Sequence, residues 1–397
     1  MELNGKRACI VGAGTSLSFT FAQEKSPLRL QAEAFFAALE DAGLQRGDID
    51  GFATAHGYPT GVDYEEFTTT LGLDCRYVDQ AWSHGRWAST LLAHAAFAVM
   101  SGLADYVAVC NTQVTARGYG HYLGGGHQLH GPSEGMRDSG GGHGEWDVHG
   151  IDTPGSGTAL VAQRYFDRYG ATPEDLARVT VSARSFGARN PMAVLGHKPL
   201  TMQTYFDEPV IAGPFRRSDY MVQNEGSTCL IVTTTDRAQD AARPAPVIAG
   251  IQGVTSNRDT HHLFSRPGLG VGFAPQYPYK APRHPVYDMA GVSMADISGL
   301  YCYDSFSSNV WMVLERLGFC GEGEAPEYIK QNGLGLDDKL PVNTNGGLLS
   351  EGDQTGYAHL VEMVRQLRGE CGPRQIPQAD VLQWASPWGD SLILTNP

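Results

Sequence analysis

A glycine-dense loop, residues 343–357 with the sequence NTNGGLLSEGDQTGY, could hold a ligand that carries or develops negative charge. Glycines stand at positions 346, 347, 352 and 356. Because glycine has no Cβ, the backbone amides of such a loop can approach a ligand closely. The N-terminus of the following helix would favour the same negative charge. A plain connector capped by Asp353 would have a similar sequence, so both interpretations stay open at this point.

A second group of chemically useful side chains lies in YCYDSFSSN, residues 301–309. Side chains alternate between the two faces of a strand, so Tyr301 and Tyr303 share one face, with Asp304 at the strand end. Parallel α/β folds place reactive groups where strands end. Tyr303 and Asp304 are therefore candidates for proton transfer, although a buried tyrosine more often belongs to a hydrophobic core.

The third segment, DQAWSHGRWASTLL at residues 79–92, places His84, Gly85 and Arg86 at the start of a helix rich in small residues. A helix N-terminus can activate a nucleophile. Ser83 precedes this group, and no cysteine stands there. The alternative is a capped helix with a surface histidine and arginine.

Strands and helices that alternate along the chain are expected to position these segments. The expected strands lie at residues 7–16, 48–57, 227–239 and 297–304, followed by a strand pair within 379–397. The expected helices lie at residues 26–44, 172–191, 307–319 and 357–369, and residues 88–113 indicate a helix, a Gly102 cap and a strand. Such alternation predicts parallel pairing and sheets covered by helices, which is an α/β fold.

Residues 118–157 interrupt this rhythm, with 14 glycines among 40 residues. Five of the thirteen histidines fall there, at positions 121, 127, 130, 143 and 149. No HExxH motif or His/Cys cluster accompanies them, so no metal site is predicted. A segment of this length without its own pattern is more typical of a flap over a pocket.

The composition limits the classes of partner. The chain of 397 residues has a formal net charge of −14, which argues against nucleic acid and against a polybasic membrane contact. Seven scattered cysteines without a CxxC pair are typical of reduced cytosolic thiols. The longest apolar run contains His94 and Asp105, so no membrane span is predicted. We expect a cytoplasmic protein.

Three stretches, in order ALEDAGLQRGDIDGF, AHAAFAVMSGLADYVAVC and NTNGG with its following EG and G, resemble the thiolase superfamily. They resemble most closely its sterol-carrier and lipid-transfer branch, over about residues 6–390. The resemblance implies a five-layered α-β-α-β-α sandwich of two similar mixed-sheet halves, usually dimeric. The halves are expected at residues 1–245, with the Gly/His-rich flap inserted at about 118–157, and at residues 246–397.

The chain departs from the family motifs at each reactive position. Where thiolases carry a nucleophilic cysteine in a C-x-S-G turn, this sequence has SHGRWAS. The motif N-E-A-F aligns with YDSF, which places Tyr303 at the asparagine and Asp304 at the glutamate. The motif G-H-P-x-G aligns with GDQTG, which places Asp353 at the histidine. Without a thiolate no acyl-enzyme can form, so condensation or thiolysis is not expected.

Within that branch the chain resembles the steroid side-chain-cleaving aldolases, which lack the cysteine and use tyrosines. The resemblance implies retro-aldol cleavage of a β-hydroxyacyl-CoA steroid side chain to a 17-ketosteroid and propionyl-CoA. It also implies a homodimer that joins an OB-fold/zinc-ribbon protein in a heterotetramer. No cofactor is expected in this chain, because the CoA thioester is the substrate and any zinc would belong to the partner.

The expected catalytic residues are Tyr303, Tyr357, Asp304 and Asp353. The expected substrate-binding or CoA-binding residues are His84, Gly85, Arg86, Asn345, Gly346 and Gly347. Backbone amides near Gly85 and Gly347 are the expected oxyanion donors. A nearby carboxylate raises a phenol's pKa, so an aspartate would orient a tyrosine or take the proton itself. Two alternatives are an acyltransferase that uses Ser83 or His84, and a non-catalytic acyl-CoA or sterol-binding protein.

Overall fold

The computed structural model describes residues 1–397 except 17–24, 57–60, 83, 115–153 and 256–283. Most of the predicted flap over 118–157 therefore lies outside the described residues. Its last four residues form the start of helix α6, which begins at Pro154. Within the described ranges no helix has the length and apolar character needed to cross a membrane.

The strands of the main sheet follow the order β3-β2-β4-β7-β1-β8-β11-β10-β9, and β5 and β6 form a separate hairpin. The bounds are β1 Ala8–Thr15, β2 Gly51–His56, β3 Tyr77–Trp82, β4 Val107–Val114, β5 Val210–Ala212, β6 Phe215–Arg216, β7 Glu225–Thr234, β8 Val247–Gln252, β9 Gly299–Cys302, β10 Val381–Ala385 and β11 Ser391–Thr395.

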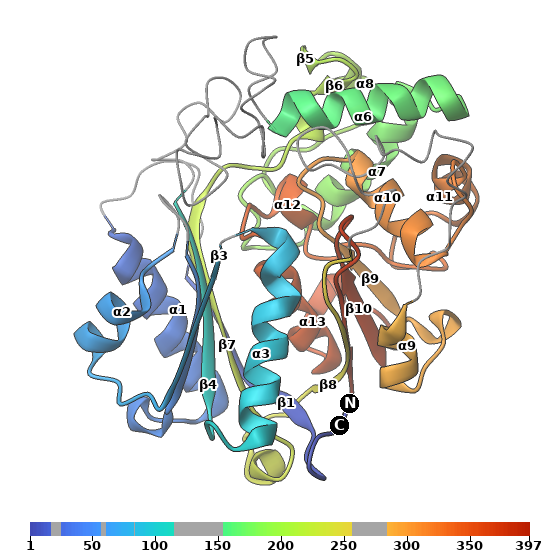
Figure 1. Cartoon of the computed structure of the whole chain (residues 1–397). Coiled ribbons are helices and arrows are strands. Elements are labelled where there is room, and N and C mark those ends of the chain that lie inside the picture. The colour runs from blue at the N-terminus through green and yellow to red at the C-terminus, as the bar shows by residue number, and fades with distance from the viewer. Residues whose placement is uncertain (17–24, 57–60, 83, 115–153, 256–283) are drawn as a thin grey trace, which may run out of the picture.

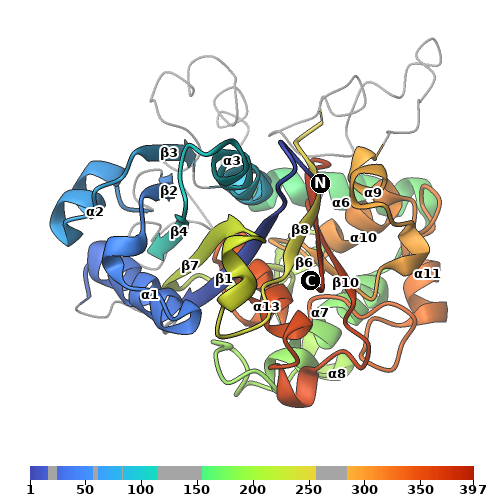
Figure 2. The ribbon, with the colours of Figure 1, turned by 90° about the horizontal axis from the view of Figure 1, so that it is seen from below.

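One strand order occurs twice in this sheet. The first half runs β3-β2-β4-β7-β1, and the second runs from an isolated bridge at Val342 through β9, β10 and β11 to β8. In each half the first three strands of this order run parallel to one another. The fourth strand is antiparallel to the third, and the fifth is antiparallel to the fourth. The register pair of Cys9 with Val247 joins β1 to β8, where the halves meet (Figure 2).

Helices cover both halves and also fill the space between them. Their bounds are α1 Pro27–Ala42, α2 Tyr64–Leu71, α3 Ala88–Ser101, α6 Pro154–Tyr169, α7 Pro173–Gly187, α8 Met202–Phe206, α9 Pro285–Ala290, α10 Ser308–Leu317, α11 Ala325–Asn332, α12 Gly347–Ser350 and α13 Tyr357–Leu367. Helices α3 and α13 lie between the strands of the two halves, with α1 and α2 outside one half and α9 to α11 outside the other (Figure 1). The layers therefore alternate α-β-α-β-α, which confirms the predicted fold class.

Local sequence explains where the helices begin and end. The Ser26 side chain accepts a hydrogen bond from the Arg29 amide at 3.1 Å and caps α1, which ends at Gly43 in the left-handed conformation (φ 69°). Asp175 accepts hydrogen bonds from the Thr172 amide and hydroxyl at 2.9 Å, which closes the first turn of α7. Gly356, with a φ of 89°, precedes α13 and fixes where Tyr357 starts that helix.

Sequence analysis missed several elements, among them α2, β3, β8 and α6. Strand β3 lies at an edge of the sheet, and its sequence YVDQAW contains Asp79 and Gln80 on a partly exposed strand. It therefore lacks the continuous apolar run that marks the buried strands. Helix α6 follows directly after the glycine-rich segment, whose composition obscured its start.

Candidate active site

Tyr303 lies in a buried aromatic cluster built from segments far apart in the sequence. Its ring centroid is 6.0 Å from that of His84 and 5.8 Å from that of Trp388. The rings of His84 and Trp388 are 5.0 Å apart, edge to face. Tyr303 directly follows β9, His84 precedes α3, and Trp388 lies in the turn between β10 and β11. The ends of both halves thus meet at this cluster.

Gly85 lies directly against the Tyr303 ring. A Cβ placed on Gly85 would be 2.2 Å from Cε2 of Tyr303, far inside van der Waals contact. A side chain at position 85 would therefore displace the tyrosine. The predicted roles of His84 and Gly85 beside the catalytic residues stay predictions, and this packing places both next to Tyr303. The side chain of Arg86 and the whole of Ser83 lie outside the described part of the chain.

Replacing Gly85 with alanine is expected to move the Tyr303 ring and to lower stability. Overpacking of this kind costs about 1–3 kcal/mol in the free energy of unfolding. Chemical denaturation would measure that loss, and steady-state kinetics would measure the accompanying fall in turnover. Gly47→Ala is the matched control, because a Cβ at Gly47 meets no atom within 4 Å. Equal stability and turnover in both variants would contradict the close approach.

Asp304 points into the loop that leads to α12, and not toward solvent. Its Oδ1 accepts a hydrogen bond from the Leu348 amide at 2.9 Å and lies 3.2 Å from His359 Nε2. Its Oδ2 has no hydrogen-bond partner among the described residues and lies where a Cβ on Gly347 would be, at 1.9 Å. Gly346 and Gly347 have φ values of 101° and 66°, which glycine adopts without strain. This carboxylate anchors the loop.

The Gly347 amide is engaged within its own loop. It donates to Asn345 Oδ1 at 3.2 Å, and the same oxygen lies 3.0 Å from His359 Nδ1. Asn345 Nδ2 in turn donates to Glu351. The Gly347 amide therefore has an acceptor within its own loop in this arrangement. The expectation that backbone amides near Gly85 and Gly347 supply oxyanion contacts stays a prediction.

Tyr357 begins α13 and belongs to the same buried hydrophobic cluster as Tyr303, between the two halves. Its hydroxyl is buried and has no hydrogen-bond partner among the described residues. Burial raises the pKa of this phenol, and the Asp79 carboxylate raises it further. The phenol is therefore protonated at neutral pH, so it suits a hydrogen-bond donor or general acid better than a base.

Asp353 is buried in the turn before α13. Its Oδ1 accepts a hydrogen bond from the Thr355 amide at 3.0 Å, and its own amide donates to the Val222 carbonyl at 3.0 Å. Burial raises the pKa of this carboxyl to about 6. A carboxyl with this pKa can exchange protons near neutral pH. The two candidate aspartates therefore have different neighbours. Asp353 contacts Val222, and Asp304 contacts His359 and Leu348.

Six of the seven cysteine thiols do not have the properties of nucleophiles. Burial raises the pKa of Cys9, Cys75, Cys110, Cys302, Cys320 and Cys371. Cys302 belongs to a different core cluster from its neighbours Tyr301 and Tyr303, so it faces the opposite side of β9. A raised pKa keeps a thiol protonated and unreactive at neutral pH.

Sequence analysis missed several side chains of this region. Trp388 and Asp390 lie in the turn between the last two strands, and Asp390 accepts a hydrogen bond from Ser89 of α3 at 3.0 Å. His359 lies two residues after Tyr357, and the sequence alone does not indicate which residue it contacts. Only the fold brings these residues together, although the PWGD turn itself is visible in the sequence.

Residues 279–386 match the family model described as "Thiolase C-terminal domain-like". A protein of Mycobacterium tuberculosis named 17-hydroxy-3-oxo-4-pregnene-20-carboxyl-CoA lyase is 33% identical over 91% of this chain and 92% of its own length. A steroid side-chain-cleaving aldolase of Thermomonospora curvata is 32% identical over 91% of this chain and 90% of its own. The chain belongs to the steroid side-chain-cleaving aldolases of the thiolase superfamily.

A solved structure of an aldolase of this family agrees with the assignment. The structure of the "Ltp2-ChsH2(DUF35) aldolase" has a TM-score of 0.84 and 27% identity, and the match covers 98% of both chains. The likeness therefore includes the central helices and both halves of the sheet.

Proposed function

We propose that this chain catalyses the retro-aldol cleavage of a β-hydroxyacyl-CoA steroid side chain to a 17-ketosteroid and propionyl-CoA. The observation that carries the proposal is the match of at least 32% identity over 91% of the chain to two enzymes named as a lyase and an aldolase of steroid side chains. The site supports it, because the two candidate tyrosines are buried and the segment that resembles the thiolase cysteine turn, SHGRWAS, contains no cysteine.

In the proposed reaction a base takes the proton from the tertiary alcohol of the substrate. The bond between the hydroxyl carbon and the α-carbon then breaks, which leaves a ketone and a thioester enolate. Donors at the thioester oxygen stabilise the enolate before it is protonated at carbon. We propose Asp353 as this base, because burial raises its carboxyl pKa to about 6. Tyr357 and Tyr303 would donate hydrogen bonds or protons.

The same proposal includes partners. The similar solved aldolase is named together with a DUF35 protein, and we propose an OB-fold/zinc-ribbon partner of that kind for this chain, in a heterotetramer. We also propose a homodimer. Strand β3 is the first in the order of the main sheet, so a second copy could continue the sheet at that edge. Because the proposed substrate is a CoA thioester, we propose a cytoplasmic location for the reaction.

The decisive experiment incubates the purified chain with a β-hydroxyacyl-CoA steroid, with and without the DUF35-type protein. We expect ketone and propionyl-CoA to form in equal amounts, measured by chromatography and mass spectrometry. An acyl group covalently attached to the chain would favour the acyltransferase alternative. Binding without turnover in both mixtures would favour the non-catalytic alternative.

A further inference from the structure

Asp304 and His359 form a buried pair between the two segments that carry the candidate tyrosines. His359 Nε2 lies 3.2 Å from Asp304 Oδ1, and the exposed fractions of the two side chains are 0% and 1%. Asp304 directly follows Tyr303 at the end of β9, and His359 lies two residues after Tyr357 in the first turn of α13. The pair therefore links the backbone next to one tyrosine with the backbone next to the other.

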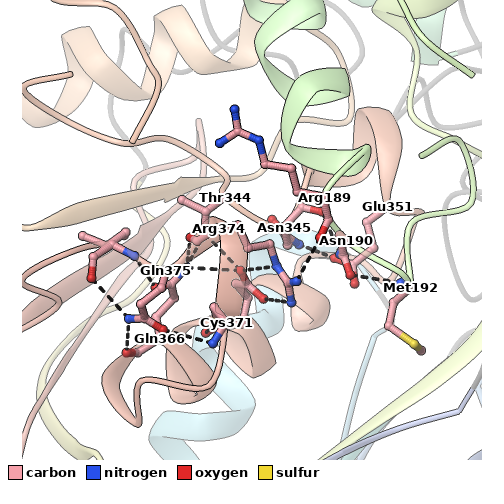
Figure 3. A network of polar contacts seen from close by, with 12 residues as sticks. Arg189, Asn190, Met192, Thr344, Asn345, Glu351, Gln366, Cys371, Arg374 and Gln375 are labelled. Carbon is pink, nitrogen blue, oxygen red and sulfur yellow. Dashed lines mark hydrogen bonds and ion pairs between the residues drawn. The ribbon is translucent and has the colours of Figure 1, made fainter. Parts of the chain in front are cut away.

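The other side of the imidazole is held as well. His359 Nδ1 lies 3.0 Å from Asn345 Oδ1, and the Tyr301 ring packs beside the imidazole with centroids 5.9 Å apart. Asn345 is fixed in turn by Glu351 and, through its carbonyl, by Asn190 Nδ2 at 2.8 Å (Figure 3). Contacts on both ring nitrogens set the orientation of the ring toward Asp304.

Tyr357 depends on such an anchor more than an ordinary buried tyrosine. Its hydroxyl makes no hydrogen bond to a described residue, so packing and the backbone at the start of α13 determine where the phenol lies. The left-handed Gly356 precedes that start and adds no side chain to hold it. His359 supplies a polar contact from the same first turn to the end of β9.

We propose that His359 is a positioning residue for the reaction: acting through Asp304, it fixes the placement of the Tyr357 phenol relative to the Tyr303 phenol. The inference rests on the proposed function of the two tyrosines. Misplacement of a catalytic group by about 1 Å can reduce the rate by about 100-fold. A change in this pair therefore affects the chemical step more than the binding of the substrate.

The test replaces His359 with leucine and, conservatively, with glutamine, whose side-chain amide can still donate to Asp304. We expect His359→Leu to lower kcat by about 10- to 100-fold, with KM within about threefold of the wild type. His359→Gln should recover a substantial part of kcat. Gln366→Leu is the control, because Gln366 is a buried polar residue of the same helix that contacts Thr344 and the Arg374 carbonyl instead.

Two outcomes would overturn the inference. One is a folded His359→Leu variant with the kcat of the wild type. The other is a Gln366→Leu variant that loses as much kcat and as much melting temperature as His359→Leu does, which would indicate general destabilisation. If the wild-type chain shows no retro-aldol turnover, the proposed function fails separately. Crystal structures of the wild type and His359→Leu then decide the inference, because it requires a shifted Tyr357 phenol in the variant.

Discussion

Tyr357→Phe is expected to lower turnover of the β-hydroxyacyl-CoA steroid by about 10²- to 10⁴-fold, the usual contribution of a positioned acid or base. The same change should raise the free energy of unfolding by about 1 kcal/mol, because a buried hydroxyl without a partner costs stability. The Tyr357 hydroxyl is buried without a partner among the described residues. Steady-state kinetics and denaturant unfolding of the same protein preparation measure both effects. Loss of activity together with a gain of stability is the expected result.

Tyr301→Phe is the matched control for this prediction. Tyr301 is also buried in the same cluster, but its hydroxyl is 2.7 Å from the Thr344 hydroxyl. Its removal should lower stability by about 1 kcal/mol and leave turnover unchanged. Tyr303→Phe should lower turnover as Tyr357→Phe does, because it removes the hydroxyl. The ring that packs on Gly85 is retained, so the local structure should be unchanged. Near-normal turnover in both Tyr303→Phe and Tyr357→Phe would remove tyrosine from the mechanism.

Elements with strong local patterns could be predicted from the sequence. Helices α1 and α7 lie within the expected ranges 26–44 and 172–191. The faces of β9 were also predicted, since Tyr301 and Tyr303 lie in one core cluster and Cys302 in another. These features depend on residues close in sequence, where propensity and periodicity act directly.

The candidate site was less accessible to sequence reasoning, because its contacts join residues far apart in the chain. The pairing of His359 with Asp304 spans 55 positions, and the Trp388 ring reaches His84 across the two halves. The use of the Gly347 amide by Asn345 is a local contact, but its geometry depends on two left-handed glycines. A loop sequence alone does not reveal which of its amides are already occupied.

Arg374→Met is expected to lower the free energy of unfolding by about 3–5 kcal/mol, because it leaves a buried carboxylate without its counter-charge. Arg374 Nε and Nη2 donate to the two carboxylate oxygens of Glu362 at 2.9 and 3.0 Å. The exposed fractions of the two side chains are 8% and 3%. Unfolding in guanidinium chloride, followed by circular dichroism, measures the change in the free energy of unfolding.

The double variant Arg374→Met with Glu362→Leu separates the cost of an unpaired charge from the value of the pair. Two apolar side chains of similar volume leave no uncompensated charge, so much of the lost stability should return. Glu362 also accepts a hydrogen bond from Thr344 at 3.1 Å, so recovery should be incomplete. The exposed pair of Arg29 with Glu33 provides the contrast, and Arg29→Ala should change stability by less than about 1 kcal/mol. A double variant as unstable as Arg374→Met would show that packing around the guanidinium, and not charge, sets the cost.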